Sequence, residues 1–447
     1  MTSRPPGRGV IVAAPSSGGG KTVFTLGLLR HLSRSGGGVA SAKAGPDYID
    51  PAFHSAATGE PCLNLDTWAM RPETVAGLLG LLRRRARLVV VEGVMGLFDG
   101  AAVEDEGRDG STASLAAATG WPVVLVVDVR GQAASAAAVV RGFSSHRPGL
   151  GIAGVVFNRV GGPRHEAALR SACARHLPEV PVLGCIPTDP RLGLPSRHLG
   201  LVQACEHPDL ELFLDAAAAA VAAHVDVDAL IGLSVPGVAP GAAPALPLPP
   251  PGSYVAVAHD EAFAFAYAAT LEGWRAQGAE VLPFSPLADE GPDPDADAVY
   301  LPGGYPELHA GRLAGNARFL KGLRDAAEGG AAVFGECGGY MVLGRGLVDG
   351  DGHRHAMADL LPLETSFARR GLRLGYRRAV LVGAGPFGME GEVLRGHEFH
   401  YASILTEGPG QPLFSISDAS GESLGWAGLR RDRVAGSFIH LIDRERT

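Results

Sequence analysis

Two segments of this 447-residue chain carry residue types that could do chemistry. Near the start, the apolar run Val10–Pro15 leads into a glycine-rich loop that ends in Lys21 and Thr22. Near the end, the apolar run Ala332–Phe334 leads into Cys337, which glycines flank. The first pattern indicates phosphate binding and the second indicates a cysteine nucleophile. A chain with both could activate an acid with ATP while a second substrate supplies the nitrogen. This pairing predicts a glutamine-fed amide synthetase.

The glycine-rich loop has the features of a phosphate-binding loop. Glycines let backbone N–H groups converge on phosphate oxygens at the start of a helix, and a helix is predicted next, over Val23–Leu32. Pro15 stands where the usual pattern has its first glycine, so the loop is a variant. Lys21 is expected to reach the β- and γ-phosphates, and Thr22 to ligate Mg²⁺. The predicted ATP-binding residues are Ser17, Gly18, Gly19, Gly20, Lys21 and Thr22.

Charged residues follow two further predicted strands of the same half. Lys43, Asp47 and Asp50 lie in the segment KAGPDYIDP, and Glu92 and Asp99 lie in EGVMGLFDG. Ligands of open parallel sheets bind beyond the carboxyl ends of the strands, and Mg²⁺ prefers hard oxygen ligands. Aspartates that only cap turns are the alternative, and for Asp99 the two interpretations have equal weight. We expect Mg²⁺ at Thr22, Asp47 and Glu92, and contacts to the substrate or acyl phosphate from Lys43, Asp50 and Asp99.

The segment around Cys337 has the pattern of a nucleophile at a sharp turn. A strand that ends in G-x-C-G-G places the thiol at the start of the next helix, whose N-terminus is expected to lower the thiol pKa. His440, at the end of the last predicted strand, is the candidate base. A buried structural cysteine is the alternative, and the glycine framing weighs against it. Backbone N–H groups of Gly303, Gly304 and Gly338 are predicted to form an oxyanion hole.

Three other titratable residues near this site have open roles. His397 and His400 are interpreted as substrate-lining or structural with equal weight, ahead of a metal site. His440 is followed by Leu-Ile-Asp, so no acid stands two positions after the histidine. A dyad of Cys337 and His440 is therefore expected, and the sequence leaves open whether Asp443 assists.

Composition narrows the class of protein. The net charge of -8 gives no general attraction to nucleic acid or anionic membranes. Five cysteines lack the spacing of a zinc site or a disulfide framework, and no apolar stretch is long enough to span a membrane. We expect a cytoplasmic protein.

The apolar pattern predicts two α/β domains joined by a proline-rich segment. We predict an ATP-binding domain over 1–233, a linker over 234–252 and a second domain over 253–447. Helices are expected over Glu261–Ala276 and Ala314–Ala327, and a last strand over Val434–Leu441. The other expected strands are Gly9–Ala14, Val39–Ala44, Leu88–Val91, Val123–Val127, Ile152–Phe157, Val182–Ile186, Tyr254–Ala258, Glu280–Phe284, Ala298–Leu301 and Ala331–Phe334.

Nearly the whole chain resembles the cobyrinate/hydrogenobyrinate a,c-diamide synthases of corrinoid biosynthesis. The segments that carry the resemblance are KAGPDYIDP (43–51), EGVMGLFDG (92–100), PSRHLGL (195–201), YLPGGYPE (300–307) and ECGGYMVL (336–343). The resemblance implies an α/β fold with an N-terminal P-loop, parallel-sheet domain similar to dethiobiotin synthetase. It also implies a C-terminal domain like those of class I glutamine amidotransferases.

The resemblance further implies the reaction, in which two peripheral carboxylates of a macrocycle become amides. Each amidation would use ATP with Mg²⁺ and ammonia released from glutamine. The implied partners are small molecules, namely the corrinoid acid, ATP and glutamine, with a homodimer as a candidate assembly. Alternatives are a sister amidotransferase, such as cobyrate synthase or the nickel-sirohydrochlorin a,c-diamide synthase, and a P-loop ATPase switch with an inactive amidotransferase-like domain. Both a cobalt-containing and a metal-free macrocycle fit the sequence.

Overall fold

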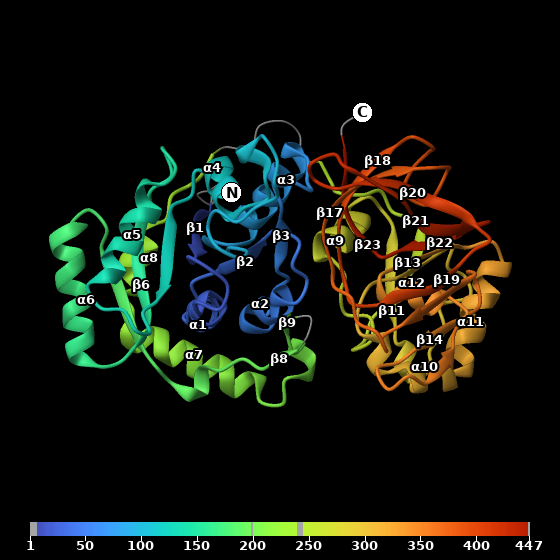
Figure 1. Ribbon diagram of the computed structural model, residues 1–447, viewed down its shortest axis with the longest axis horizontal. Helices are drawn as coiled ribbons and strands as arrows, with labels where there is room; N and C mark the ends of the chain where they lie inside the picture. The colour runs from blue at the N-terminus through green and yellow to red at the C-terminus, as the bar shows by residue number, and fades with distance from the viewer. Residues whose placement is uncertain (1–6, 198–199, 239–244, 446–447) are drawn as a thin grey trace. The chain divides into compact units, whose positions relative to one another are not determined.

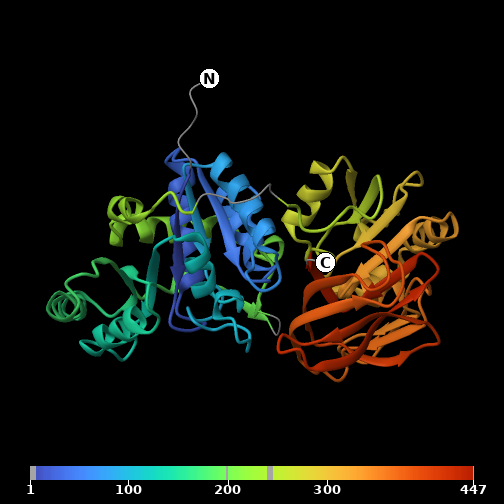
Figure 2. The ribbon, with the colours of Figure 1, turned by 90° about the horizontal axis from the view of Figure 1, so that it is seen from above.

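The computed structural model describes residues 7–197, 200–238 and 245–445, which form two compact units (Figures 1 and 2). The first unit runs to Trp68 and resumes over Val75–Ala245, while the second takes Ala69–Thr74 and Leu246–Thr447. The units divide inside the segment predicted as a linker. Residues 239–244 of that segment, and residues 198–199 of PSRHLGL, lie outside the described residues. The domain limits set from the sequence stay a prediction.

A seven-stranded parallel sheet forms the centre of the first unit, with the strand order β3-β2-β4-β1-β5-β6-β7. Its strands are almost fully buried because helices cover both faces, which is why they read as continuous apolar runs. Strand β3 was not predicted, since three residues carry little periodicity. The strands are β1 (Arg8–Ala13), β2 (Val39–Ala44), β3 (Leu63–Leu65), β4 (Leu88–Glu92), β5 (Val123–Asp128), β6 (Ile152–Val160) and β7 (Val182–Pro187).

The helices of the first unit connect successive strands and pack on one another. Helix α1 lies against α2 and α7, and α5 lies against α6 (Figure 1). Ser234 is buried and Val235 pairs with Gly9, so the first residues of the predicted linker pack on this unit. Strands β8 (Ser196–Arg197) and β9 (Gly200–Leu201) pair in antiparallel fashion. The helices are α1 (Lys21–Arg34), α2 (Asp50–Thr58), α3 (Pro72–Arg85), α4 (Thr112–Thr119), α5 (Ser135–Ser145), α6 (Pro163–His176), α7 (Leu210–His224) and α8 (Val227–Leu233).

A ten-stranded mixed sheet forms the centre of the second unit, with the order β11-β10-β12-β13-β22-β21-β20-β17-β18-β23 (Figure 2). Pairs from β11 to β22 are parallel, and the pairs from β22 to β23 are antiparallel. The strands of this sheet are β10 (Tyr254–Ala258), β11 (Glu280–Phe284), β12 (Ala298–Leu301), β13 (Ala332–Glu336), β17 (Arg373–Leu381), β18 (Val393–His400), β20 (Gln411–Ser417), β21 (Ser423–Arg431), β22 (Val434–Ser437) and β23 (Ile439–Arg444).

Side chains of alternate residues in the ten-stranded sheet pack into two hydrophobic cores, one on each face. Val299 and Val333 belong to one core, and their neighbours Tyr300 and Phe334 belong to the other, as the two faces of a strand require. A smaller four-stranded sheet adds to this unit. The remaining elements are β14 (Gly346–Val348), β15 (Arg354–Ala356), β16 (Leu363–Ser366), β19 (Ser403–Glu407), α9 (Ala268–Ala276), α10 (Ala310–Gly315), α11 (Ala317–Glu328) and α12 (Gly338–Leu343).

Two helices predicted in the second unit have the wrong extent. The helix expected to begin at Glu261 begins at Ala268, because the backbone N–H of Phe265 bonds to Gly303 O at 2.9 Å instead of continuing a helix. The helix predicted over Ala314–Ala327 is two helices that break at Asn316. The side chain of Asn316 donates to Pro286 O at 2.7 Å, a contact with a distant part of the chain that anchors the break between the two helices.

The last predicted strand, Val434–Leu441, is two strands that meet at Phe438. Strand β22 lies inside the sheet, where it pairs with β13. Strand β23 is an edge strand of the same sheet and pairs with β18. The chain therefore changes neighbours between Ser437 and Ile439. Among the described residues, no helix is both long enough and apolar enough to cross a membrane.

Candidate functional site

The glycine-rich loop connects β1 to α1 in the first unit. Gly18 (φ 78°) and Gly20 (φ 91°) adopt the left-handed conformation that glycine reaches without strain. Gly20 is the residue that precedes the first turn of α1, so the N–H groups of the helix start lie at the loop. A Cβ on Gly20 would clash with the amide of Asn158, which donates to Gly19 O at 3.1 Å. The loop has the backbone form that phosphate binding needs.

Sequence reasoning missed two residues that hold this loop, Asn158 and Arg159. Arg159 has φ 61°, a conformation that costs energy for a side chain of its size. Its Nη1 donates to Gly18 O at 2.9 Å and to Asp128 Oδ2 at 2.5 Å. The signal was present, since an Asn-Arg pair follows an apolar run directly. Beside the loop lies a cavity of about 150 Å³, whose lining includes Gly20, Phe24, Asn158, Pro187 and Asp189.

Glu92, at the end of β4, is the centre of a buried charged cluster. Its Oε1 accepts hydrogen bonds from Thr22 Oγ1 at 2.6 Å, Lys43 Nζ at 3.0 Å and Lys21 Nζ at 3.4 Å. Its Oε2 lies 2.6 Å from Nε2 of His54. These partners outweigh burial and hold the pKa of Glu92 well below its usual value. Three segments far apart in sequence thus meet at one carboxylate.

His54 was not predicted, although it lies four residues after Asp50 on α2. Burial alone would lower its pKa, but contacts with Cys62 and Glu92 raise the pKa to about 10. Its Nδ1 lies 3.4 Å from Cys62 Sγ. The ring therefore lies between a thiol and a carboxylate, and it fixes the second oxygen of Glu92.

The two lysines of the cluster differ in their surroundings. Burial and the nearby charge of Lys43 lower the pKa of Lys21, despite Glu92. Burial also acts against the charged form of Lys43, but Asp50, Glu92 and Asp47 raise its pKa above the usual value. Nζ of Lys43 lies 2.5 Å from Asp50 Oδ2. Lys43 is therefore the more firmly charged of the two.

Asp47 and Asp50 lie on either side of the start of α2. Oδ1 of Asp47 accepts from the backbone N–H groups of Ile49 and Asp50, at 2.8 and 3.2 Å. Its Oδ2 lies 4.0 Å from Lys43 Nζ, and its side chain keeps 32% exposure. Burial and then Asp47 raise the pKa of Asp50 to about 6. Asp47 therefore caps a turn while one oxygen still faces the cluster.

Asp99 has the turn-capping geometry that was one of its two predicted interpretations. Its Oδ2 accepts from Gly96 N at 2.8 Å, and a Cβ on Gly96 would lie 2.6 Å from that oxygen and from Pro15 O. The turn therefore packs against the residue before the phosphate loop. A direct contact of Asp99 with substrate stays a prediction.

The oxygens predicted to ligate Mg²⁺ form a suitable donor set. Oγ1 of Thr22 and Oε1 of Glu92 are 2.6 Å apart, and Oδ2 of Asp47 lies 4.0 Å from Nζ of Lys43, which itself bonds to Glu92. All are hard oxygen donors, and Mg²⁺ usually takes one or two carboxylates from a protein. These residues fit the ion, and its binding here stays a prediction.

Cys337 stands between β13 and α12 in a strained conformation. Its φ of 48° and ψ of -104° lie outside the regions that side chains normally adopt, and such strain is typical of a nucleophile at a sharp turn. A 2.8 Å hydrogen bond from its N–H to Ser437 O fixes this backbone. Gly339 allows the turn, because a Cβ there would overlap Leu301 O.

The prediction that the helix N-terminus lowers the thiol pKa is wrong. Burial raises the pKa of Cys337 well above its usual value, and the charge of Glu307 adds to this effect. The hydrogen bond from Gly338 N opposes the shift without overcoming it. Helix α12 has only six residues, so its dipole is small. The resting nucleophile is therefore a thiol.

His440 lies on β23 beside Cys337. A Cβ on Gly303 would clash with His440 Cε1, and it would lie 3.1 Å from His440 Nε2 and 3.3 Å from Cys337 Cβ. The thiol-bearing residue and the imidazole thus border the same small space. Burial lowers the pKa of His440 to about 3, with smaller contributions from His397 and His400. A neutral imidazole is the form that can accept the thiol proton.

The three glycines predicted for the oxyanion hole lie around this space. A Cβ on Gly338 would lie 3.0 Å from Gly304 N, so the two backbones are close. Gly303 lies next to both Cys337 and His440, since a Cβ on Gly303 would contact both side chains. The backbones of Gly304 and Gly338 are thus close to each other and to Cys337, and the oxyanion hole stays a prediction.

His397 and His400 lie on β18 in different surroundings. His397 pairs with His440 across the β18–β23 ladder and packs edge-on against Tyr376. His400 Nε2 lies 2.9 Å from Glu398 Oε1, and its ring stacks on Phe438 at 3.9 Å between centroids. His400 thus has a structural packing role, while His397 faces the base.

Asp443 is held by Arg71 within the second unit. Oδ2 of Asp443 accepts from Arg71 N at 2.9 Å, and Oδ1 accepts from Arg71 Nη2 at 2.8 Å. Nη2 of Arg71 also donates to the backbone oxygen of Leu246 at 2.9 Å. Both oxygens of Asp443 are therefore directed at Arg71.

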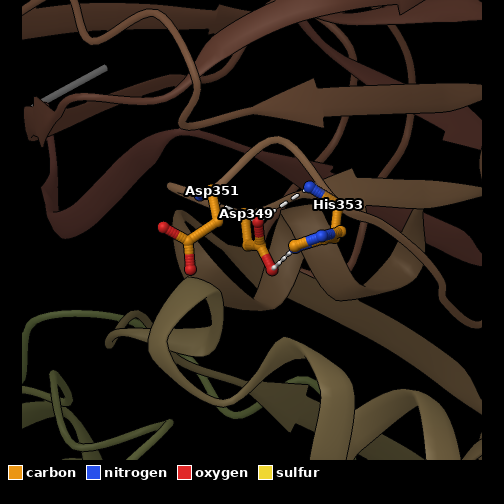
Figure 3. Close-up of side chains that lie close together, drawn as sticks. All are labelled: Asp349, Asp351 and His353. Atoms are coloured by element: carbon orange, nitrogen blue, oxygen red, sulfur yellow. Dashed lines mark hydrogen bonds and ion pairs between the residues drawn. The ribbon is translucent and has the colours of Figure 1, made fainter.

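A third cluster, of Asp349, Asp351 and His353, has ligand atoms within 4.8 Å of one another (Figure 3). Oδ1 of Asp349 accepts from the backbone N–H groups of Asp351 and His353, and Oδ2 lies 2.8 Å from His355 Nε2. These bonds lower the pKa of Asp349 to about 2, despite some burial. The hydrogen bonds of an exposed turn account for this arrangement, so the cluster is assigned no role.

Comparison with known proteins identifies both halves. The family model described as "CobQ/CobB/MinD/ParA nucleotide binding domain" matches residues 10–202, and that of the "CobB/CobQ-like glutamine amidotransferase domain" matches residues 254–447. The chain is 56% identical to the hydrogenobyrinate a,c-diamide synthase of Brucella abortus, over 98% of each chain. It is 54% identical to that of Rhizobium meliloti, over 97% of this chain and 99% of the other, and 53% identical to that of Rhodobacter capsulatus, over 97% and 98%. The chain belongs to the family of hydrogenobyrinate a,c-diamide synthases, which join a nucleotide-binding domain to a glutamine amidotransferase domain.

Proposed function

We propose that this chain amidates the a and c carboxylates of hydrogenobyrinic or cobyrinic acid, using ATP and glutamine. The observation that carries the proposal is the near full-length identity of 53 to 56% to relatives with the name hydrogenobyrinate a,c-diamide synthase. The two clusters described above supply chemistry that suits the two halves of such a reaction. Sister amidotransferases and an inactive switch are less favoured, because the similarity extends over both halves.

In the first unit, the reaction would begin with the transfer of the γ-phosphoryl group of ATP to a carboxylate. A carboxylate is a poor acyl donor, and the acyl phosphate formed with release of ADP is a good one. Lys21 starts α1 directly after the phosphate loop, so its ammonium would offset phosphate charge. Lys43 is held between Asp50 and Glu92, where it would face the reacting oxygens. The cavity beside Gly20 offers space for the base of the nucleotide.

Thr22, Asp47 and Glu92 would hold Mg²⁺. A bound Mg²⁺ neutralises charge on the phosphate oxygens during transfer. The cluster brings together three basic side chains, those of Lys21, Lys43 and His54, and three acidic ones, those of Asp47, Asp50 and Glu92. When nucleotide binds, the lysines could therefore turn from Glu92 to phosphate oxygens while Glu92 pairs with Mg²⁺, so that no buried charge is left unpaired.

In the second unit, Cys337 Sγ would attack the carbonyl carbon of the glutamine side-chain amide, while His440 takes the thiol proton. The N–H groups of Gly304 and Gly338 would stabilise the oxyanion. Collapse of the tetrahedral intermediate breaks the C–N bond, and ammonia leaves with the proton from His440. Water then hydrolyses the thioester to glutamate. Ammonia attacks the acyl phosphate and releases phosphate, which completes one amide.

The substrate is tested by assaying hydrogenobyrinic, cobyrinic and sirohydrochlorin-type acids side by side with purified enzyme. We expect glutamine-dependent ADP release with a corrinoid acid and products that gain two amide groups by mass. Amidation confined to a sirohydrochlorin-type acid, or ATP hydrolysis independent of any tetrapyrrole, would contradict the proposal. Sedimentation of the purified chain tests the candidate homodimer, and cell fractionation tests the proposed cytoplasmic location.

A further inference from the structure

Glu336, the residue before the nucleophile, is a buried carboxylic acid that the sequence left without a role. It is the last residue of β13, where it pairs with Ser437 of β22. Its Oε1 accepts from Leu441 N at 3.0 Å, and its Oε2 accepts from Tyr300 Oη at 2.7 Å. Two donors on two different strands therefore fix the carboxyl group in one orientation.

The fixed oxygen of Glu336 faces the imidazole of His440. Oε2 lies 4.0 Å from His440 Nδ1, and both side chains are buried. The other ring nitrogen, Nε2, lies on the side of Gly303 and Cys337. A Cβ on Gly303 would lie 3.1 Å from this nitrogen and 3.3 Å from Cys337 Cβ. The ring thus has the thiol toward one nitrogen and a carboxyl group toward the other. This order is that of a nucleophile, a base and an orienting acid.

Asp443 does not compete for this position. Both of its oxygens are directed at the backbone and guanidinium of Arg71. It follows His440 by three residues, beyond an irregularity in the register of β18 and β23, and its carboxylate is bound by Arg71. Glu336, although it is far from His440 in sequence, is the acid that the fold brings to the ring.

We propose that Glu336 is the positioning residue of the amidotransferase site and orients His440 through its Nδ1, in place of the acid missing after the histidine. The proposal rests on the glutaminase role proposed for Cys337. A separation of 4.0 Å exceeds a hydrogen bond, and it suits a resting pair in which the ring is neutral. When the thiol proton moves to Nε2, the ring becomes a cation, and attraction draws it to the carboxylate.

The charged groups around His440 explain why such a partner is needed. Burial, His397 and His400 all oppose the imidazolium, whereas Glu398 on the neighbouring strand favours it. Burial raises the pKa of Glu336 itself to about 7, although hydrogen bonds from Tyr300 and Leu441 favour its charged form. Glu336 gains its negative charge as the pH rises through about 7. Glutamine hydrolysis is therefore expected to increase over that range.

The decisive variant is Glu336→Gln, which keeps the size of the side chain and can still accept from Leu441 N. Glutamine hydrolysis is measured across pH 5.5–9 with the full-length enzyme, beside synthesis driven by ammonium salts. We expect kcat for glutamine to fall about 100-fold or more, with KM changed little, because proton transfer loses its oriented base. The rise in activity around pH 7 should disappear, and ammonia-driven synthesis should persist.

Asp443→Asn is the matched control, since it neutralises the acid nearest to His440 in sequence. It should keep glutamine kcat within about threefold of wild type. Tyr300→Phe is the second test variant, because it removes one donor to Glu336 and leaves the carboxyl group. In this variant, the acidic limb of the pH profile of glutamine hydrolysis should shift to higher pH, because the charged form of Glu336 loses a hydrogen bond.

The outcomes separate this inference from the proposed function. A wild-type enzyme without glutaminase activity would overturn the proposed function itself. An active wild type with Glu336→Gln equally active, or with an unchanged pH profile, would overturn the role of Glu336 alone. If Glu336→Gln loses ammonia-driven synthesis as well, the Tyr300→Phe variant decides. A shift of the acidic limb of its pH–activity profile to higher pH supports the inference. An unshifted acidic limb contradicts it.

Discussion

Thr22 and Glu92 meet at a distance of 2.6 Å, where the hydroxyl of the phosphate loop donates to the carboxylate at the end of β4. Thr22 lies at the start of α1, which the loop connects to β1, and Glu92 ends β4; β1 and β4 are hydrogen-bonded neighbours in register from Arg8–Leu88 to Val12–Glu92. The contact therefore follows from sheet register, and it brings the predicted nucleotide-binding and metal-binding residues to one edge of the sheet.

Replacing Cys337 with alanine should separate the two half-reactions. We expect glutamine-driven amidation to fall by about 10³-fold or more, because no other group can form the thioester. Amidation driven by ammonium salts at raised pH should persist. Product formation by mass spectrometry measures both. Cys205→Ala, at an exposed thiol, is the control and should retain glutamine-driven activity. Loss of ammonia-driven synthesis in a folded Cys337→Ala enzyme would contradict this division of labour.

Two substitutions of Asp47 should distinguish its charge from its turn cap. Asp47→Asn keeps an oxygen for the N–H groups of Ile49 and Asp50, whereas Asp47→Ala removes it. Asparagine should weaken the ATP-dependent step about tenfold or more, with an increased magnesium requirement, and leave the melting temperature nearly unchanged. Alanine should also destabilise the fold by about 1 kcal/mol. Glutaminase turnover is the internal control. Normal amidation by Asp47→Asn would remove this carboxylate from the metal site.

Gly303→Ala should damage the amidotransferase site by steric overlap. The added Cβ would clash with the His440 ring and lie 3.3 Å from Cys337 Cβ. We expect glutamine kcat to fall about 100-fold, because small displacements of reacting groups are costly, while ammonia-driven synthesis continues. Gly315→Ala, where a Cβ meets no atom within 4 Å, is the control. Wild-type turnover by Gly303→Ala would mean that His440 and Cys337 do not share this space.

Glu398 should make the second unit sensitive to acid. Burial opposes its charge, but the hydrogen bond from His400 and the charge of Arg377 lower its pKa from 4.5 to about 2. The folded state thus favours the charged form, which contributes stability above pH 4.5 and loses it as the pH falls toward 2. The shift corresponds to about 3 kcal/mol at most.

Urea unfolding at several pH values between 2 and 6 measures this contribution. Glu398→Gln should show a shallower fall in the free energy of unfolding over this range than wild type. Glu390→Gln, at an exposed glutamate, should keep the wild-type slope. Equal slopes for all three proteins would show that Glu398 does not govern acid unfolding.

Much of the first unit could be predicted because its signals are local. The apolar runs that form β1, β2 and β4 are buried on both faces, so each run is readable without knowledge of its neighbours. The P-loop glycines and the KAGPDYIDP segment follow these strands directly. Parallel strands end on the same edge of a sheet, and this rule alone groups Thr22 with Glu92.

Errors arose where a contact distant in sequence overrides local preference. Residues 261–267 favour a helix by composition, but a turn at 261–263 and the Phe265–Gly303 backbone pairing take their place. The single strand predicted over Val434–Leu441 divides at Phe438, because its two halves pair with β13 and β18. The thiol of Cys337 is not activated by its helix, since desolvation outweighs the dipole of one short helix.

The sequence by itself determined the two centres, their residue types and the family, because glycine turns, nucleophile and phosphate loop are contiguous motifs. Only the tertiary structure decided which acid serves which centre. Glu336 lies beside the nucleophile in sequence and beside His440 in space, whereas Asp443 follows His440 in sequence and is bound to Arg71. Strand pairing sets such proximity, and pairing partners far apart along the chain leave no local signal in the sequence.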